Sequence, residues 1–172
     1  MGVNGDVNAH IAYVSIGSNM GDALENCRTG ILALEESGAS VITGRSHFYK
    51  TEPVDYTDQD WFVNAAVRME TRLRPAGLLT ELNAIERRFG RDRKSSIRFG
   101  PRPLDMDIIF YDDLILNTSD LILPHPRMDK RRFVLQPICD IDPTCVHPVF
   151  KRNMQYLLAH LDDEGQGMTL CE

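Results

Sequence analysis

Two aspartates, Asp105 and Asp107, stand two residues apart at the head of an apolar run. In an extended strand, residues i and i+2 point the same way, so the two carboxylates share one face. Leu104, Met106 and Ile108 then share the opposite, apolar face. Two neighbouring carboxylates repel each other unless a cation lies between them, and Mg²⁺ is usually held by one or two carboxylates together with substrate phosphates. The pair therefore predicts a site for one or two magnesium ions.

A strongly basic stretch precedes the aspartates. Between Arg87 and Arg102 the only acid is Asp92, although the whole chain has a net charge of −6. Guanidinium groups bind phosphate oxygens in a bidentate manner, and beside a carboxylate-held metal they make a polyphosphate site. Gly90 and Gly100 flank much of the stretch, which predicts a cationic flap that closes over a triphosphate.

Each feature also has a simpler interpretation. The aspartates can pair with Arg98 and Arg102 at a sheet edge, and a charge run most often lies on a solvated surface. The segment IGSNMGD is neither a Walker-type phosphate loop nor a GxGxxG motif. A tight turn followed by a helix capped by Asp22 explains it equally well. Only the combination of carboxylates with arginines favours phosphoryl chemistry.

Aromatic residues suggest a second half to the site. Phe62 and Asn64 begin a predicted strand next to Trp61, and Phe133 lies far downstream. A single aromatic is more often core than ligand, but two facing rings sandwich a flat heterocycle, whose polar edge an amide such as that of Asn64 can read. His125 in LPHPR is either structural or a donor to phosphates.

Hydrophobic periodicity outlines the elements that must position these residues. It predicts strands at 11–17, 41–49, 64–72, 104–111 and 114–116, and helices at 23–37, 75–90, 133–141 and 153–161. Asp112 and Asp113 are expected to form the turn of a hairpin between the last two strands. The order βαββαββ followed by helices predicts an α/β sandwich with a mostly antiparallel sheet flanked by helices.

The composition narrows the class of protein. The length of 172 residues suits one domain, expected at 11–162 between a flexible leader (1–10) and a C-terminal tail (163–172). No apolar run is long enough to span a membrane, and we expect a monomer. The four cysteines lack CxxC pairing or metal-site spacing, which favours a reducing cytoplasm. The acidic net charge disfavours nucleic acid as a partner.

Four stretches, in this order, resemble the 6-hydroxymethyl-7,8-dihydropterin pyrophosphokinase family of folate biosynthesis: VSIGSN, FVNAAV, GRDRKSSIRFGPRPLDMDII and LPHPRMDKRRFVLQP. The resemblance covers residues 11–161, and RFGPRPLDMDII is its most diagnostic part. It implies a ferredoxin-like α/β sandwich. It also implies ATP-dependent transfer of a pyrophosphoryl group to the pterin hydroxymethyl, releasing AMP, with two Mg²⁺ between Asp105 and Asp107.

The same resemblance implies roles for individual residues. Arg91 and Arg102 would act on the migrating phosphates beside Asp105 and Asp107. The implied ATP-binding residues are Asn83, Glu86, Arg93, Lys94, Arg98, Phe99, Arg102, the backbone at Ile108 and Ile122, His125 and Arg131. The implied pterin-binding residues are Thr51, Pro53, Val54, Phe62, Asn64, Phe99, Asp105 and Phe133.

The chain departs from the family pattern in a few places. Phe62 stands where tyrosine is frequent, Phe99 where tryptophan is common, Met106 where leucine or isoleucine is usual, and Pro126 where a tyrosine occurs in some members. The basic loop is also one residue longer than in some members. These differences leave open which of Arg91, Arg93 and Lys94 reaches the phosphates.

Two other functions are compatible with parts of the pattern. Nucleotidyltransferases also combine a GS turn with a DxD strand, but usually within one segment, whereas Gly17 and Asp105 are far apart here. They release pyrophosphate rather than AMP. A small nucleic-acid-binding module would use the basic loop and would show steeply salt-dependent affinity.

Overall fold

The computed structural model describes residues 9–91, 99–162 and 166–171. Its elements, in chain order, are β1 (His10–Ser18), α1 (Ala23–Glu36), β2 (Ser40–Arg45), β3 (Tyr49–Thr51), β4 (Phe62–Thr71), α2 (Pro75–Arg88), β5 (Asp105–Tyr111), β6 (Leu116–Asn117), β7 (Ile122–Leu123), a 3-10 turn (Met128–Lys130), α3 (Arg132–Ile141), α4 (Met154–Ala159) and β8 (Met168–Leu170).

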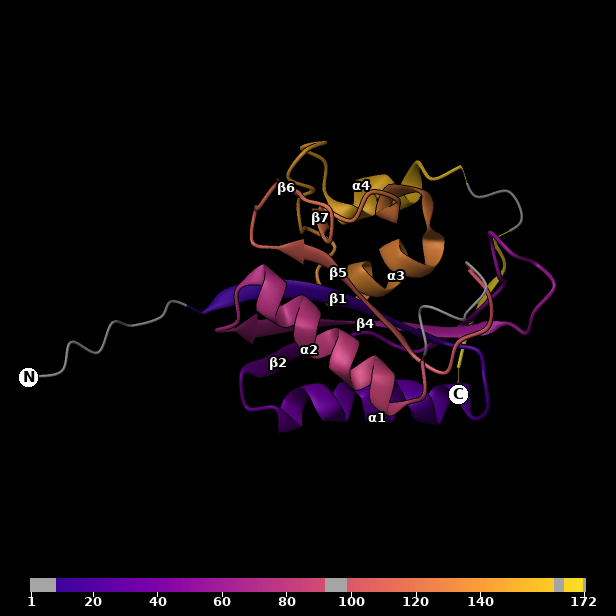
Figure 1. Ribbon diagram of the computed structural model, residues 1–172. Coiled ribbons are helices and arrows are strands. Elements are labelled where there is room, and N and C mark those ends of the chain that lie inside the picture. Colours follow the sequence, from indigo (N-terminus) through magenta and orange to yellow (C-terminus); the bar gives the residue numbers. More distant parts are fainter. Residues whose placement is uncertain (1–8, 92–98, 163–165, 172) are drawn as a thin grey trace, which may run out of the picture.

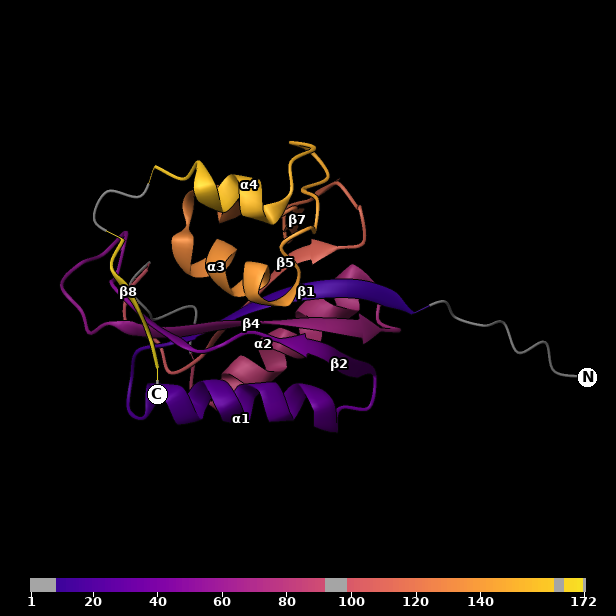
Figure 2. The same cartoon turned by 180° about the vertical axis from the view of Figure 1, so that it is seen from behind.

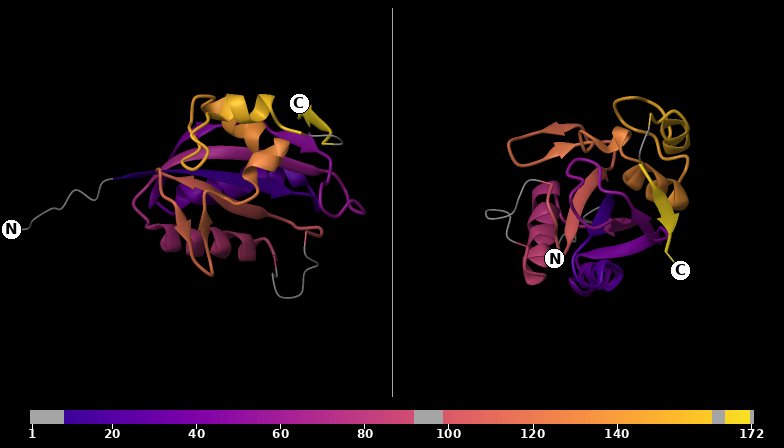
Figure 3. Two further views of the ribbon diagram at one scale, coloured as in Figure 1. Left: turned by 90° about the horizontal axis from the view of Figure 1, so that it is seen from above. Right: turned by 90° about the vertical axis from the view of Figure 1, so that its right-hand side faces the viewer.

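One antiparallel sheet forms the centre of the protein. Its strands lie in the order β5-β1-β4-β3-β8, and β2 also pairs with β4. The helices α1 and α2 cover one face, and α3 and α4 lie over the other (Figure 1). Figure 2 gives the same layers from behind, and in Figure 3 (right) α1 (indigo) lies below the sheet while α2 (magenta) stands at its left, in contact with α1. This arrangement is the predicted sandwich of helices on a mostly antiparallel sheet.

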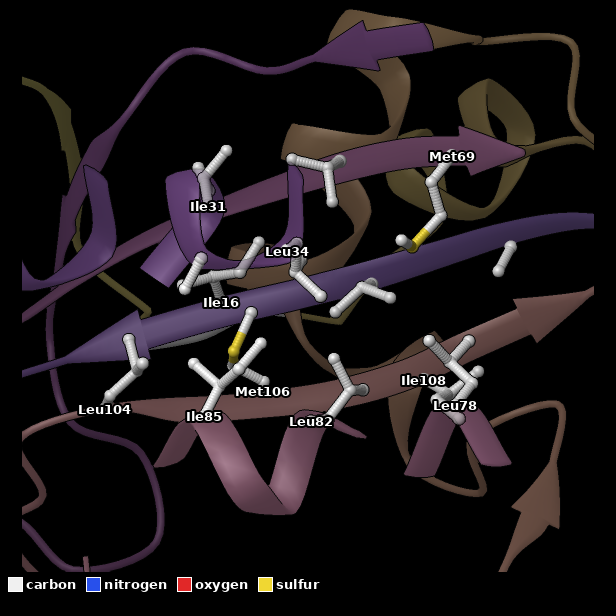
Figure 4. Close-up of a cluster of buried hydrophobic side chains, with 14 of the residues drawn as sticks. Ile16, Ile31, Leu34, Met69, Leu78, Leu82, Ile85, Leu104, Met106 and Ile108 are labelled. Carbon is white, nitrogen blue, oxygen red and sulfur yellow. The ribbon is translucent and has the colours of Figure 1, made fainter. Parts of the chain in front are cut away.

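The two long helices form where local sequence signals place them. The Asp22 side chain accepts a hydrogen bond from the Glu25 backbone N at 3.0 Å, which caps α1, and Gly38, with φ +69°, follows its end. Pro75 occupies the first turn of α2, where its missing N–H costs nothing. The α2 stripe of Leu78, Leu82 and Ile85 is buried against the sheet (Figure 4).

The apolar face of β5 packs as predicted. Met106 and Ile108 point toward the α2 side chains in Figure 4 and are 1% and 3% exposed. Asp105 and Asp107 are partly exposed on the other face. Burial of one face thus fixes the register that presents both carboxylates to the side covered by α3.

A β-bulge interrupts the pairing of β5 with β1. Tyr13 pairs with Phe110 and Val14 pairs with Ile108, so Ile109 is an extra residue between these pairs. Ile109 and Phe110 therefore both join the cluster under α3 and α4, and Tyr111 turns back to the α1/α2 side.

Two expectations about the strands and two about the chain ends are wrong or incomplete. The segment 114–116 does not form a hairpin with β5: Leu116 starts β6, which pairs with β7, because the turn after Tyr111 leads the chain away from the sheet. The strand expected at 41–49 is divided into β2 and β3. His10, expected in the leader, belongs to β1, and part of the expected tail forms β8, which pairs with β3.

Candidate active site

Strand register builds the floor of the site. Gly17 of β1 pairs with Asp105 on one side and with Asn64 of β4 on the other. A Cβ on Gly17 would lie only 2.6 Å from Asn64 Oδ1, so glycine is required for the Asn64 amide to lie across the strand. That amide is 5% exposed and donates through Nδ2 to Thr51 Oγ1 at 2.6 Å. The absence of a side chain at Gly17 thus lets the Asn64 amide lie across β1, on whose other side Gly17 pairs with Asp105.

A cavity of about 220 Å³ opens above this floor. It brings together most of the site residues expected from sequence: Thr51, Pro53, Val54, Phe62, Asn64, Arg91, Phe99, Arg102, Asp105, Asp107, His125, Arg131 and Phe133. They come from β3, β4, β5, α3 and the segments that join them. Residues 50 or more positions apart therefore line one space.

Other lining residues were not expected from sequence. Ser15 and Gly17 follow from the alternation of β1 once its pairing with β5 is known, since Ser15 lies opposite Asp107. Arg127 stands two residues after His125, which is a weak local signal. Asp55 carried no signal, because it lies in an irregular link rich in charged residues.

Two arginines converge on Asp105. Arg102 Nη1 lies 2.8 Å from Asp105 Oδ2, and Arg91 Nη1 bonds to Asp105 Oδ1. The partner Arg102 is one of the two that the ion-pair interpretation named. In the described part of the chain no three His, Cys, Asp or Glu residues are grouped to hold a metal. A cation at Asp105 and Asp107 would therefore need water or substrate oxygens as its other ligands, which is the coordination that Mg²⁺ favours.

A buried asparagine fixes Arg102. Asn19, 6% exposed, accepts from the Arg102 backbone N through Oδ1 at 2.9 Å, and its own backbone N donates to Arg102 O at 3.1 Å. Asn19 Nδ2 also donates to Gln59 Oε1 at 2.9 Å, and Gln59 Nε2 donates to Phe99 O at 2.9 Å. Asn19 belongs to the VSIGSN stretch but had no predicted role. These bonds join the end of β1, the link before β4 and the approach to β5.

An arginine guanidinium group lies over each phenylalanine ring of the cavity. Arg102 lies over the Phe62 ring at 5.2 Å, and Arg131 lies over the Phe133 ring at 5.4 Å. The third ring, Phe99, has a positive φ of 60°, which is rare for a bulky residue and indicates a conformation imposed by its surroundings. The rings thus serve both as apolar walls and as supports for cations.

His125 is held neutral. Burial, reinforced by the charges of Arg131 and Arg127, lowers the pKa of His125 to about 4. Its Nδ1 accepts from the Arg127 backbone N at 3.2 Å, which places the proton of the neutral ring on Nε2. A neutral donor at Nε2 is compatible with the expected contact to phosphate oxygens.

Several predicted nucleotide residues do not line this cavity. Glu86 is 1% exposed and accepts from Met106 N at 2.8 Å and from Arg91 Nη1 at 3.0 Å, so its carboxylate positions Arg91. Ile108 lies in the core beneath β5, and Ile122 is exposed on β7. Asn83 Oδ1 is buried without a hydrogen-bond partner in the described part of the chain. The predicted Arg93, Lys94 and Arg98 lie outside the described residues.

Comparisons with known proteins point to one family. The family described as 7,8-dihydro-6-hydroxymethylpterin-pyrophosphokinase (HPPK) matches residues 13–143. A Bacillus subtilis relative, 2-amino-4-hydroxy-6-hydroxymethyldihydropteridine pyrophosphokinase, is 42% identical over 132 residues, which cover 77% of this chain and 78% of the relative.

Longer relatives match as well. The mitochondrial folate synthesis bifunctional protein of Arabidopsis thaliana is 46% identical over 77% of this chain, which spans only 23% of that protein. Among solved structures, a Plasmodium falciparum HPPK-DHPS with pterin and p-hydroxybenzoate superimposes with a TM-score of 0.70. That likeness covers 91% of this chain and 44% of the other at 15% identity, so it supports the fold alone.

Proposed function

The chain belongs to the 7,8-dihydro-6-hydroxymethylpterin-pyrophosphokinase family, and on that premise we propose that it carries out the family's reaction in folate biosynthesis. It would transfer a pyrophosphoryl group from ATP to the hydroxymethyl group of 6-hydroxymethyl-7,8-dihydropterin, giving the pterin diphosphate and AMP. One observation carries the proposal. A single cavity places an oriented amide and aromatic rings beside a carboxylate pair and several arginines.

The pterin half of the site would be formed by β3, β4 and α3. Phe62 and Phe133 offer apolar ring faces, and the fixed Asn64 amide offers a donor and an acceptor for the polar edge of a flat heterocycle. Thr51 holds Asn64 in that orientation, and Pro53 and Val54 line the same side. A ring bound here would point its substituent toward the two aspartates of β5.

The phosphate half would be formed by β5 and its basic neighbours. Asp105 and Asp107 would hold Mg²⁺, which when bound would offset the charge of the phosphate oxygens and bring them together. Arg91 and Arg102 are already bonded to Asp105, so their charges lie where the phosphates would meet the metal. Arg131 and the Nε2 proton of His125 would contact the same phosphates.

The reaction is an in-line displacement at the β-phosphorus. The pterin hydroxyl oxygen forms the new P–O bond while the bond between the α–β bridging oxygen and the β-phosphorus breaks, and AMP leaves with that bond's electrons. Asp105 or Asp107 orients the hydroxyl group. The proton of the hydroxyl passes to water. Positioning and electrostatic stabilisation by Arg91 and Arg102 can supply most of the acceleration in such a transfer.

Product analysis tests this proposal. The protein is incubated with ATP, MgCl₂ and hydroxymethyldihydropterin, and the nucleotide products are separated. AMP formed in equal amount with a pterin diphosphate is the expected result. Release of pyrophosphate with a nucleotidylated acceptor would instead support a nucleotidyltransferase and refute the proposal.

The setting of the reaction is also proposed. The four cysteines are free thiols in the structure, which suits a reducing compartment such as the cytoplasm, although two plant relatives are named as mitochondrial. No helix in the described ranges is long and apolar enough to cross a membrane. We also propose that the active form is a monomer.

A further inference from the structure

Asp55 and Arg127, which form an ion cluster with Arg131 at the cavity, have no role in the reaction described above. Asp55, in the link between β3 and β4, accepts from Arg131 Nη2 at 3.0 Å, and both of its carboxylate oxygens lie 3.4 Å from Arg127 Nη1. All three residues line the cavity. The side chains of Arg131, Asp55 and Arg127 are 13%, 34% and 40% exposed, so the cluster is desolvated mainly at Arg131.

The two guanidinium groups have supports other than Asp55. Arg127 lies over the Phe99 ring at 4.4 Å, and Arg131 lies over the Phe133 ring at 5.4 Å. Such cation–π contacts hold a guanidinium while leaving its N–H groups free to turn toward an anion. The arginines are therefore expected to keep their places when the Asp55 carboxylate is removed or displaced.

The surroundings of the two arginines favour an anion. Burial and the nearby charge of Arg127 lower the pKa of Arg131, and Asp55 and Asp107 act in the opposite direction. Two guanidiniums converging on one pair of oxygens form the arrangement that also suits phosphate. A carboxylate from the link thus occupies a place where a phosphate would bind well.

We propose that Asp55 is an internal stand-in for a substrate phosphate, holding Arg127 and Arg131 until a phosphate group displaces it. Arg127 then becomes a further phosphate-binding residue of the site. This inference rests on the proposed nucleotide substrate. Asp55 directly follows Pro53 and Val54, which line the expected pterin side, so its displacement shifts the wall against which the pterin binds. Gln59, bonded to Phe99 O, anchors the far end of the link.

The first test compares two neutralised acids of the same link. Inorganic tripolyphosphate is titrated into the wild type, Asp55→Asn and Asp58→Asn by calorimetry in the presence of MgCl₂. Asp58→Asn removes one negative charge from the same link, and among the residues that the structure describes Asp58 makes no ion pair or side-chain hydrogen bond. We expect Asp55→Asn to bind about three- to tenfold more tightly, since one competing carboxylate is lost, and Asp58→Asn to change little. An equal gain in both variants, or none in Asp55→Asn, overturns the proposal.

A double-mutant cycle separates competition from positioning. If Asp55 and a phosphate compete for Arg127, then Arg127→Gln weakens tripolyphosphate binding more in the Asp55→Asn background than in the wild type. Weaker binding by Asp55→Asn alone would mean that Asp55 positions the arginines, which also overturns the proposal. Formation of AMP by the wild type is measured separately. A protein that forms no AMP refutes the proposed function, and the tripolyphosphate comparison still decides the role of Asp55.

Discussion

Replacing Gly17 by alanine tests the floor of the site most directly. The new Cβ would lie 2.6 Å from Asn64 Oδ1, whereas ordinary contact begins at 3.4 Å, so the amide must move by about 0.8 Å. That movement would disturb the bond of 2.6 Å between Asn64 Nδ2 and Thr51 Oγ1, whose residues are 5% and 2% exposed. Leaving these buried groups poorly paired costs about 1–3 kcal/mol of unfolding free energy.

This substitution is expected to impair function mainly by weakening the binding of the pterin. A shift of this size in a binding amide weakens pterin affinity by roughly 10- to 100-fold. Tripolyphosphate affinity changes much less, because the atoms nearest to the added Cβ belong to Asn64 and Val63 and not to the arginines. Calorimetric titration with each ligand and urea denaturation measure the three quantities. Gly77→Ala in α2 is the matched control, since its Cβ would meet Leu73 at an ordinary 3.7 Å. Unchanged pterin affinity in Gly17→Ala would refute this account of the site.

Three further predictions follow from the described contacts. Asp107→Ala lowers the rate of AMP formation by about a thousandfold or more, because a metal ligand is lost, with an unchanged circular dichroism spectrum; an active variant contradicts the metal assignment. Glu86→Ala reduces the unfolding free energy by about 3–5 kcal/mol in urea denaturation, because Met106 N and Arg91 lose a buried partner, whereas Glu86→Gln keeps an acceptor and loses less. Burial lowers the pKa of His147 in the folded chain. As the pH drops below about 6.5, the unfolded chain therefore binds a proton at His147 that the folded chain does not bind, and the free energy of unfolding falls. In urea denaturation across this pH range, the wild type should lose more unfolding free energy than His147→Gln.

The features that the sequence predicted well are those set by nearby residues. The cap at Asp22 and the stripe of α2 depend on spacings of three and four, and the shared face of Asp105 and Asp107 depends on a spacing of two. The short strands were harder. The three residues of β8 carry too little pattern to predict, and they form a strand because the edge of β3 is there to pair with.

The site shows the same division. Asn64 and the aspartates could be singled out from residue type and periodicity, but the need for Gly17 follows only from the register of β1 with both neighbours. The cluster around Asp55 joins residues 72 and 76 positions apart through a link without regular structure. Nothing local distinguishes that acid from the others in the link, so only the folded chain identifies it.

The bulge at Ile109 gives β5 two independent halves. Strict alternation along the strand would place Tyr111 on the same side as the aspartates, but the extra residue turns it under the sheet, where its hydroxyl donates to Leu73 O at 2.8 Å. The end of the strand that bonds to Leu73, just before α2, is thereby phased separately from the end that presents the acids. Substitutions around Tyr111 can therefore accumulate without turning Asp105 and Asp107 away from the cavity. Deleting Ile109, in contrast, would force one half of the strand to present its side chains to the opposite face of the sheet.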